Sequence, residues 1–321
     1  MIPSQGIRLW CPFDDENNPA CEDAVQHSWD ILAESGMLTD PGKIPKLRRA
    51  RTGELASRTN PRCSPAALRL AAEWYLWLFA FDDGYCDEGG LGEDPSHMAL
   101  AVSRLSRCLD ASFDLRDPLT HEMFLRRIRA ALADQATPPQ LRRWESAVRE
   151  YLAAQVWESA NRRLGRIPSL AEYTIMRRHA GATYTCLAII EVVGGYEVPA
   201  ALAASVPVQK LNDLAADIVS WDNDVYSFPK EYAVDGAVHN LVGVLVEELQ
   251  TDAAAAFGHA MGMCDSQMQR FAKTSELVRQ QFSSPQLNEY IVGVELWLSG
   301  HIAWCENSAR FAPDDGTVSG I

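Results

Sequence analysis

Apolar residues recur every three to four positions over several long segments, and this helical period is the feature that most constrains the fold. The segments span residues 66–81, 142–160, 169–193, 208–226, 236–281 with breaks, and 284–311. Few runs alternate apolar and polar side chains as a half-buried strand would. No linker, internal repeat or low-complexity block divides the chain. We therefore predict an all-α fold, with residues 1–321 forming a single-domain helical bundle.

Local signals mark some boundaries of these helices. Ser169 is followed by Glu172 in the pattern of a capping box, directly behind Pro168, which predicts a helix start at this point. The N-terminal segment 1–18 contains Pro3, Gly6 and Pro12, and residues 312–321 are polar and rich in glycine. We expect both ends of the chain to be irregular.

Composition and charge narrow the class of partner. The 321 residues are 47% hydrophobic, which suffices for a large core. A formal charge of −14 argues against nucleic acid and anionic membrane surfaces as partners. No apolar stretch is long enough to span a membrane. The cysteines lack a CxxC pair and the chain start lacks a secretory signal, so we expect reduced thiols in a cytoplasmic protein.

The apolar segment 71–81 ends in a cluster of acids. Four carboxylates follow within seven positions: Asp82, Asp83, Asp87 and Glu88. The C-terminal end of a helix carries a partial negative charge, which disfavours each carboxylate by roughly 0.3–1 kcal/mol. A solvated helix end would explain an isolated pair such as Asp14 and Asp15 in the N-terminal segment. The larger cluster predicts a positive partner at this helix end.

A second group of oxygen-bearing side chains lies at residues 221–231. Asn223, Ser227 and Glu231 are spaced i, i+4, i+8, so on a helix they share one face. An amide oxygen, a hydroxyl and a carboxylate suit Mg²⁺, which takes few protein ligands together with substrate phosphate. Pro229 should kink the last turn and leaves the direction of Glu231 open. An ordinary polar helix face is the alternative interpretation.

Together, these motifs resemble those of bacterial class I terpene synthases. That family has an aspartate-rich segment ending a helix near residue 80, and a motif of the form seen here from Asn223 to Glu231. Arg177, which lies 46 residues before Asn223, matches the family's diphosphate-sensing arginine. Gly181 matches the helix-break position whose carbonyl helps to trigger ionisation. The resemblance runs from about residue 60 to 311.

The resemblance implies a role for each matching residue. The metal ligands would be Asp82, Asp87, Asn223, Ser227 and Glu231, holding three Mg²⁺ ions. The diphosphate would contact Arg177, Lys230 and Arg310. Aromatic faces stabilise carbocations, and the candidates for the cavity wall are Phe79, Trp304, Trp74 and Trp77. Any one of these aromatic residues could instead serve only in core packing.

Two positions depart from the family pattern. Cys86 occupies the fifth position of the usual DDxxD motif, and the looser DDxxxD form places Asp87 one helical turn after Asp83. Phe311 replaces the tyrosine that usually follows the C-terminal arginine, here Arg310. The phenylalanine lacks the hydroxyl that would donate to the diphosphate.

The activity implied is the cyclisation of a linear isoprenyl diphosphate to a terpene, with release of diphosphate. The enzyme would be a carbon–oxygen lyase with farnesyl diphosphate as the preferred substrate. Geranyl and geranylgeranyl diphosphate remain alternatives. A chain-elongating prenyltransferase would carry a second aspartate-rich motif where this chain has Asn223, Ser227 and Glu231. A helical protein that only binds isoprenoid diphosphates is the non-enzymatic alternative, and a homodimer is compatible with the resemblance.

Overall fold

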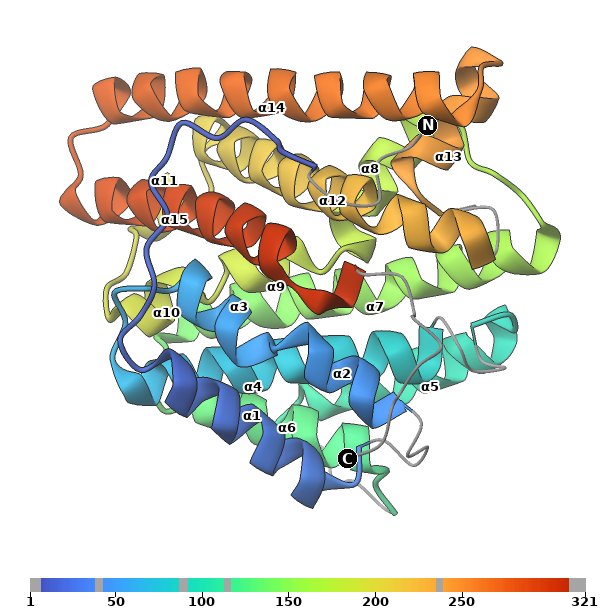
Figure 1. The fold of residues 1–321 in the computed structure, drawn as a ribbon. Helices are drawn as coiled ribbons and strands as arrows, with labels where there is room; N and C mark the ends of the chain where they lie inside the picture. The colour runs from blue at the N-terminus through green and yellow to red at the C-terminus, as the bar shows by residue number, and fades with distance from the viewer. Residues whose placement is uncertain (1–6, 38–42, 87–91, 113–116, 235–238, 312–321) are drawn as a thin grey trace.

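The computed structural model describes residues 7–37, 43–86, 92–112, 117–234 and 239–311. Within these ranges it contains helices and no strand, which confirms the all-α prediction (Figure 1). The α-helices are α1 (Cys21–Ser35), α2 (Ile44–Ala50), α3 (Thr52–Thr59), α4 (Pro65–Phe81), α5 (Pro95–Cys108), α6 (Thr120–Ala133), α7 (Pro138–Leu164), α8 (Leu170–Ala180), α9 (Thr183–Leu187), α10 (Ile190–Gly194), α11 (Ala200–Ala203), α12 (Val206–Val234), α13 (Leu241–Leu249), α14 (Ala253–Gln281) and α15 (Pro285–Asn307). A π-helix, η2 (Asp82–Cys86), follows α4, and a 3₁₀-helix, η3 (Ala309–Phe311), follows α15. None of the described helices is long and apolar enough to cross a membrane.

Helix α4 is buried along most of its length and forms the centre of the lower part of the bundle (Figure 1). Ser64 caps its start by accepting a hydrogen bond from the Ala67 amide at 3.3 Å, and Pro65 occupies the first turn. Trp74 stacks on Trp77 with ring centroids 5.4 Å apart. Both indoles are fully buried and belong to the core, and neither lines the cavity described below, whereas Tyr75 and Phe79 of α4 do.

Helix α12 runs between α14 and α15 in the upper part of the bundle (Figure 1). The sequence predicts a helix over 208–226, whereas α12 continues through Pro229 to Val234. A proline removes one amide donor and usually kinks a helix, but the rest of this helix is packed against its neighbours. The added length carries Ser227 and Glu231 in helical geometry.

The predicted helix over 169–193 is divided into α8, α9 and α10. Ser169 accepts a hydrogen bond from the Glu172 amide at 3.3 Å, so the predicted start is confirmed. The reciprocal half of the capping box is wrong, because the Glu172 carboxylate accepts from Arg166 and Trp157 instead. The first break follows α8, where Ala182 adopts a left-handed conformation with φ of 57°.

Residues 7–20 form an irregular segment that crosses in front of α12, close to α14, and then runs past α15 to α1 (Figure 1). The Trp10 amide donates to Asp265 of α14 at 3.1 Å. The Ser299 hydroxyl of α15 donates to the Asp14 carbonyl at 3.1 Å. The described part of this segment is irregular, as predicted, but it is fastened to the bundle rather than loose.

Candidate active site

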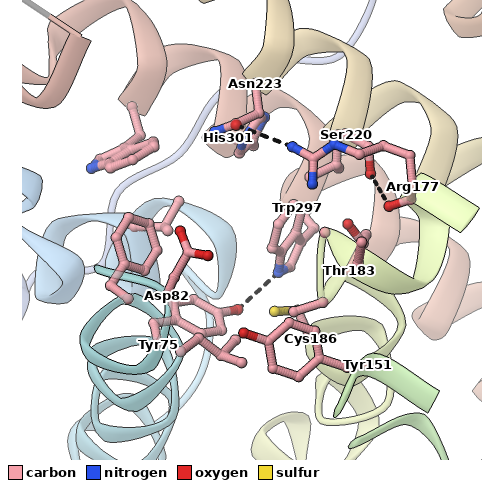
Figure 2. A pocket seen from close by; sticks show the side chains of 18 of the residues that line it. Tyr75, Asp82, Tyr151, Arg177, Thr183, Cys186, Ser220, Asn223, Trp297 and His301 are labelled. Carbon is pink, nitrogen blue, oxygen red and sulfur yellow. Dashed lines mark hydrogen bonds between the residues drawn. The ribbon is translucent and has the colours of Figure 1, made fainter. Parts of the chain in front are cut away.

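A pocket opens where α4, η2, α8, α9, α12, α15 and η3 meet, and it encloses about 800 Å³ including its open mouth. Several residues selected from the sequence line it: Phe79, Asp82, Arg177, Gly181, Asn223, Trp304 and Arg310. Asp82 lies on one side of the pocket, and Asn223 and Arg177 lie on the opposite side (Figure 2). The fold thus brings the two predicted motifs to face each other across one cavity. Asp87 lies outside the described residues.

The neighbouring acids Asp82 and Asp83 have different surroundings. The Asp82 side chain is 40% exposed and faces the pocket. The Asp83 carboxylate is fully buried and accepts from both terminal nitrogens of Arg310, while Lys46 Nζ lies 2.9 Å from its Oδ1 atom. Lys43 donates to the Asp83 carbonyl at 2.8 Å. Positive side chains are therefore present at this helix end. They are Lys43, which precedes α2, Lys46 of α2 and Arg310 of η3.

Electrostatics keep Asp83 ionised. Burial alone would raise the pKa of its carboxyl group, but the charges and hydrogen bonds of Arg310 and Lys46 outweigh this effect and hold the pKa below its usual range. The backbone around it forms the π-helix η2, a geometry that occurs mostly as single turns and often at functional sites. Asp83 anchors basic side chains, and Asp82 remains directed at the pocket.

The predicted oxygen column follows one face of α12. Asn223 lines the pocket, and its Oδ1 atom accepts from Arg177 at 3.4 Å. Ser227 and Glu231 both lie within hydrogen-bond reach of the Asn240 amide nitrogen, at 3.4 and 2.9 Å. Their common neighbour indicates that they share a face despite Pro229. Lys230 is half-buried and, like Ser227 and Glu231, is absent from the residues that line the pocket.

Arg177 is held in place by Asp224, the residue after Asn223. Its Nε and Nη2 atoms donate to Asp224 Oδ1 at 3.1 and 2.9 Å. The other carboxylate oxygen of Asp224 accepts from the Tyr173 hydroxyl and from the Leu241 amide. Burial would lower the pKa of Arg177, but the Asp224 carboxylate raises it well above its ordinary value. The guanidinium is therefore a fixed cation at the pocket wall.

The break after α8 depends on a close approach between helices. A Cβ atom on Gly181 would lie 2.7 Å from the Ser220 hydroxyl oxygen of α12 and 3.1 Å from the Arg177 carbonyl oxygen. Only glycine fits this contact without displacement. Thr183, at the start of α9, is 1% exposed and lines the pocket, and its hydroxyl has no hydrogen-bond partner within the described part of the chain.

Aromatic side chains form the wall contributed by α4 and α15. Phe79 and Trp304 pack edge to face with centroids 5.8 Å apart, and the Arg310 guanidinium lies 4.6 Å from the Phe79 centroid. The indole N–H groups point to fixed acceptors, from Trp304 to the Ala50 carbonyl and from Trp297 to the Tyr75 hydroxyl. Both tryptophans line the pocket with part of their ring surface.

His301 lines the same wall and stacks on Trp297 with an interplanar angle of 12°. Burial lowers the pKa of His301 to about 3, so its imidazole is neutral at physiological pH. Sequence reasoning missed His301 and Thr183. It also assigned no role to three residues that contact predicted site residues or their neighbours: Lys46, Asp224 and Asn240. The periodicity of 284–311 could have placed His301 on the face of Trp297 and Trp304, since the three residues are spaced at four and three positions.

Comparison with known proteins now identifies the class. Residues 73–270, more than half of the 321, match the family model described as terpene synthase family 2, C-terminal metal binding. The chain belongs to the terpene synthase family. It is a bacterial-type class I terpene synthase, a lyase, as the sequence predicts.

Curated relatives match along nearly the whole chain. A 4-epi-cubebol synthase of Streptosporangium roseum, described as cyclizing (2E,6E)-farnesyl diphosphate, is 31% identical, covering 94% of this chain and 91% of its own. A (+)-T-muurolol synthase of Roseiflexus castenholzii, with the same substrate description, is 33% identical, covering 95% of this chain and 94% of its own.

Solved structures share the fold. Germacradien-4-ol synthase from Streptomyces citricolor superposes with a TM-score of 0.82 at 25% identity, covering 94% of this chain and 99% of its own. The 2-methylisoborneol synthase from Streptomyces coelicolor A3(2), in complex with Mg²⁺ and 2-fluoroneryl diphosphate, has a TM-score of 0.85 at 22% identity, covering 96% and 98% of the two chains. At that identity the likeness concerns the fold alone.

Proposed function

We propose that the protein is a Mg²⁺-dependent sesquiterpene cyclase that ionises farnesyl diphosphate, cyclises the carbocation and releases diphosphate. The observation that carries this proposal is the position of Asp82 across one pocket from Asn223 and Arg177, above an aromatic wall. The substrate descriptions of the relatives support the fifteen-carbon chain length.

The residues present fit a metal site that bridges two helices. Asp82 presents a half-exposed carboxylate on one side of the pocket and Asn223 an amide oxygen on the other. Ser227 and Glu231 follow Asn223 on the same face of α12, outside the residues that line the pocket. We assign these residues and Asp87 as the ligands of three Mg²⁺ ions. Hard cations prefer oxygen ligands of this kind. When bound, the ions neutralise charge on the leaving diphosphate.

Basic side chains at the same end of the pocket would bind the diphosphate. Arg177 and Arg310 offer planar forks that match phosphate oxygens, and Lys230 offers a point charge. Asp224 orients Arg177, so the hydrogen-bond donors are arranged before the substrate arrives. Gly181 allows the backbone at the helix break to approach this arginine, and we assign its carbonyl a part in ionisation.

The aromatic wall would protect and stabilise the carbocation. Phe79 and Trp304 present ring surfaces that attract cations. Among the described residues that line the pocket, the charged side chains are those at the diphosphate end, Asp82, Arg177 and Arg310. The Tyr75 hydroxyl lies near three polar partners, Trp297, Asn60 and Thr59, and is therefore engaged by the protein.

We further propose that residues 1–321 act as one class I domain in the cytoplasm, alone or as a homodimer. The seven cysteines whose side chains the structure describes, which leaves Cys86 aside, are free thiols, and this supports a reducing compartment. The net charge of −14 argues against nucleic acid as a partner.

The test is to incubate the purified protein with the ten-, fifteen- and twenty-carbon diphosphates in Mg²⁺ and to analyse the extract by mass spectrometry. We expect a cyclic product from farnesyl diphosphate, and none in the presence of a chelator. A product from another chain length would reassign the substrate. Elongated diphosphates formed with isopentenyl diphosphate would favour a prenyltransferase, and no turnover of any substrate would favour a binding protein.

A further inference from the structure

Asn240, the residue before α13, lies beside the proposed metal ligands of α12 and is fully buried. Its Nδ2 atom donates to the Asp224 carbonyl at 2.8 Å and to Glu231 Oε2 at 2.9 Å. These two acceptors can take both amide hydrogens, and Ser227 Oγ lies within reach at 3.4 Å. One side chain thus connects two turns of α12.

The orientation of the Asn240 amide is fixed by its other half. Its Oδ1 atom accepts from the Val242 amide at 2.9 Å and caps the start of α13. An exchange of the amide oxygen and nitrogen would place an oxygen against the Glu231 carboxylate and an NH₂ group against a backbone N–H. The hydrogen-bond network therefore excludes that alternative.

The hydrogen bond from Asn240 to Glu231 lies close to Pro229, which weakens the same part of α12. A proline inside a helix removes one backbone hydrogen bond, so the turn that carries Glu231 is less firmly held by α12 itself. The hydrogen bond from Asn240 replaces part of that restraint from outside the helix.

We infer that Asn240 is a positioning residue that aims the Glu231 carboxylate along the metal-binding face of α12. The inference rests on the proposed function, in which Glu231 is a metal ligand. Groups that hydrogen-bond to metal ligands fix their direction, and their loss typically costs 10- to 100-fold in metal affinity or activity.

The same segment connects the ligand to the diphosphate end of the pocket. The Leu241 amide, next to Asn240, donates to Asp224 Oδ2 at 3.1 Å. Asp224 in turn binds Arg177. The start of α13 therefore holds both Glu231 and the carboxylate that orients Arg177.

The test measures metal binding directly on the full-length protein. Mn²⁺ is titrated by electron paramagnetic resonance in the presence of inorganic diphosphate, with wild type, Asn240→Ser and Asn240→Thr. Both variants keep an oxygen that can cap α13 but lose the amide donor to Glu231. We expect Mn²⁺ affinity to fall 10- to 100-fold, while the melting temperature without metal changes by no more than a few degrees.

A helix cap elsewhere provides the matched control. Asp252 caps α14 by accepting from the Ala254 and Ala255 amides at 3.0 and 2.9 Å, and it is exposed. Asp252→Ala should lower the melting temperature and leave Mn²⁺ affinity unchanged. In a Glu231→Gln background, Asn240→Ser should weaken Mn²⁺ binding further by less than threefold, because the group it aims is already altered.

The outcomes separate the inference from the proposed function. Wild-type affinity in both Asn240 variants, or tighter binding, would overturn the positioning role while the metal site stands. Additive losses with Glu231→Gln would likewise assign Asn240 to general packing. If the wild type itself binds no Mn²⁺ with diphosphate, the metal site and the role of Asn240 both fall.

Discussion

Arg310 of η3 and Asp83 of η2, the π-helix that follows α4, form a bidentate ion pair with N–O distances of 3.1 and 3.2 Å. Asp83 is fully buried, so Asp83→Asn should lower the free energy of unfolding by about 3–5 kcal/mol, the typical cost of removing one partner of a buried pair. Asp82→Asn should change it by only about 0.5 kcal/mol, because Asp82 is half-exposed. Denaturant titration compares the two. Similar losses would mean that the two acids are not separated by burial as described.

Turnover, unlike stability, should depend strongly on Asp82. Asp82→Asn should reduce the rate by orders of magnitude, since it removes a proposed metal ligand from the pocket wall. Asp14→Asn is the control, because the Asp14 side chain is exposed on the N-terminal segment and should have almost no effect. Product formation is measured by mass spectrometry at saturating Mg²⁺. Equal rates in the two variants would contradict the assignment of Asp82.

Variants of Arg310 and Phe311 can distinguish a role in packing from a role in substrate binding. Arg310→Lys should slow ionisation by roughly tenfold, about 1.4 kcal/mol at the barrier, because a lysine lacks the planar fork. Phe311→Tyr should be tolerated, since Phe311 is only partly buried, against Trp304 and Tyr226. Melting temperature and turnover are measured on both. An early-melting Phe311→Tyr protein together with an unchanged Arg310→Lys rate would assign the pair to packing.

Gly181→Ala should disturb the helix break next to Arg177. The added methyl group would lie 2.7 Å from Ser220 Oγ, so α8 and α12 must separate at a cost of about 1–3 kcal/mol. We expect a lower rate as well, because Arg177 belongs to the displaced turn. Ser220→Ala removes the nearest clashing atom and should partly restore both stability and rate in the double variant. No rescue would show that the Arg177 carbonyl, 3.1 Å away, sets the limit instead.

His301 should make stability depend on pH. Its folded pKa of about 3 lies below the ordinary value of 6.5, so only the unfolded chain takes up a proton as the pH falls between these values. The free energy of unfolding should therefore drop by about 2 kcal/mol between pH 7 and 5 through this residue. His301→Phe keeps a ring against Trp297 and should lack this contribution. Unfolding curves at both pH values give the difference, and a constant gap would refute burial of a neutral imidazole.

The long helices could be predicted because their signals are local. The segments 66–81 and 142–160 lie entirely within α4 and α7, since a 3.6-residue period is a property of the segment itself. The shorter helices α1, α2, α3, α5 and α6 were not predicted. In α1, α2, α3 and α6 the residue before the helix makes no capping side-chain hydrogen bond, so their starts carry no capping signal in the sequence. Helix α5 does have a cap, since Asp94 accepts from the Ser96 amide at 2.9 Å.

The part of the site that lies on a single helix could be predicted from the sequence. Contacts between residues of separate helices could not. The spacing of Asn223, Ser227 and Glu231 identifies a common face from sequence alone. The difference between Asp82 and Asp83 depends on cations contributed by α2 and η3, far away in the chain. Asn240 is likewise invisible to spacing, because it reaches α12 from a separate element.

The two walls of the pocket come from different parts of the chain. Asp82, Arg177 and Asn223 lie within residues 73–270, which match the family's metal-binding region, whereas Trp297, His301 and Trp304 lie beyond it on α15. Helix α15 is in turn fastened from outside by the N-terminal segment. A chimera that exchanges α15 together with residues 7–20 would therefore replace the α15 part of the pocket wall. It would retain Asp82, Arg177 and Asn223, the residues proposed to act on the diphosphate.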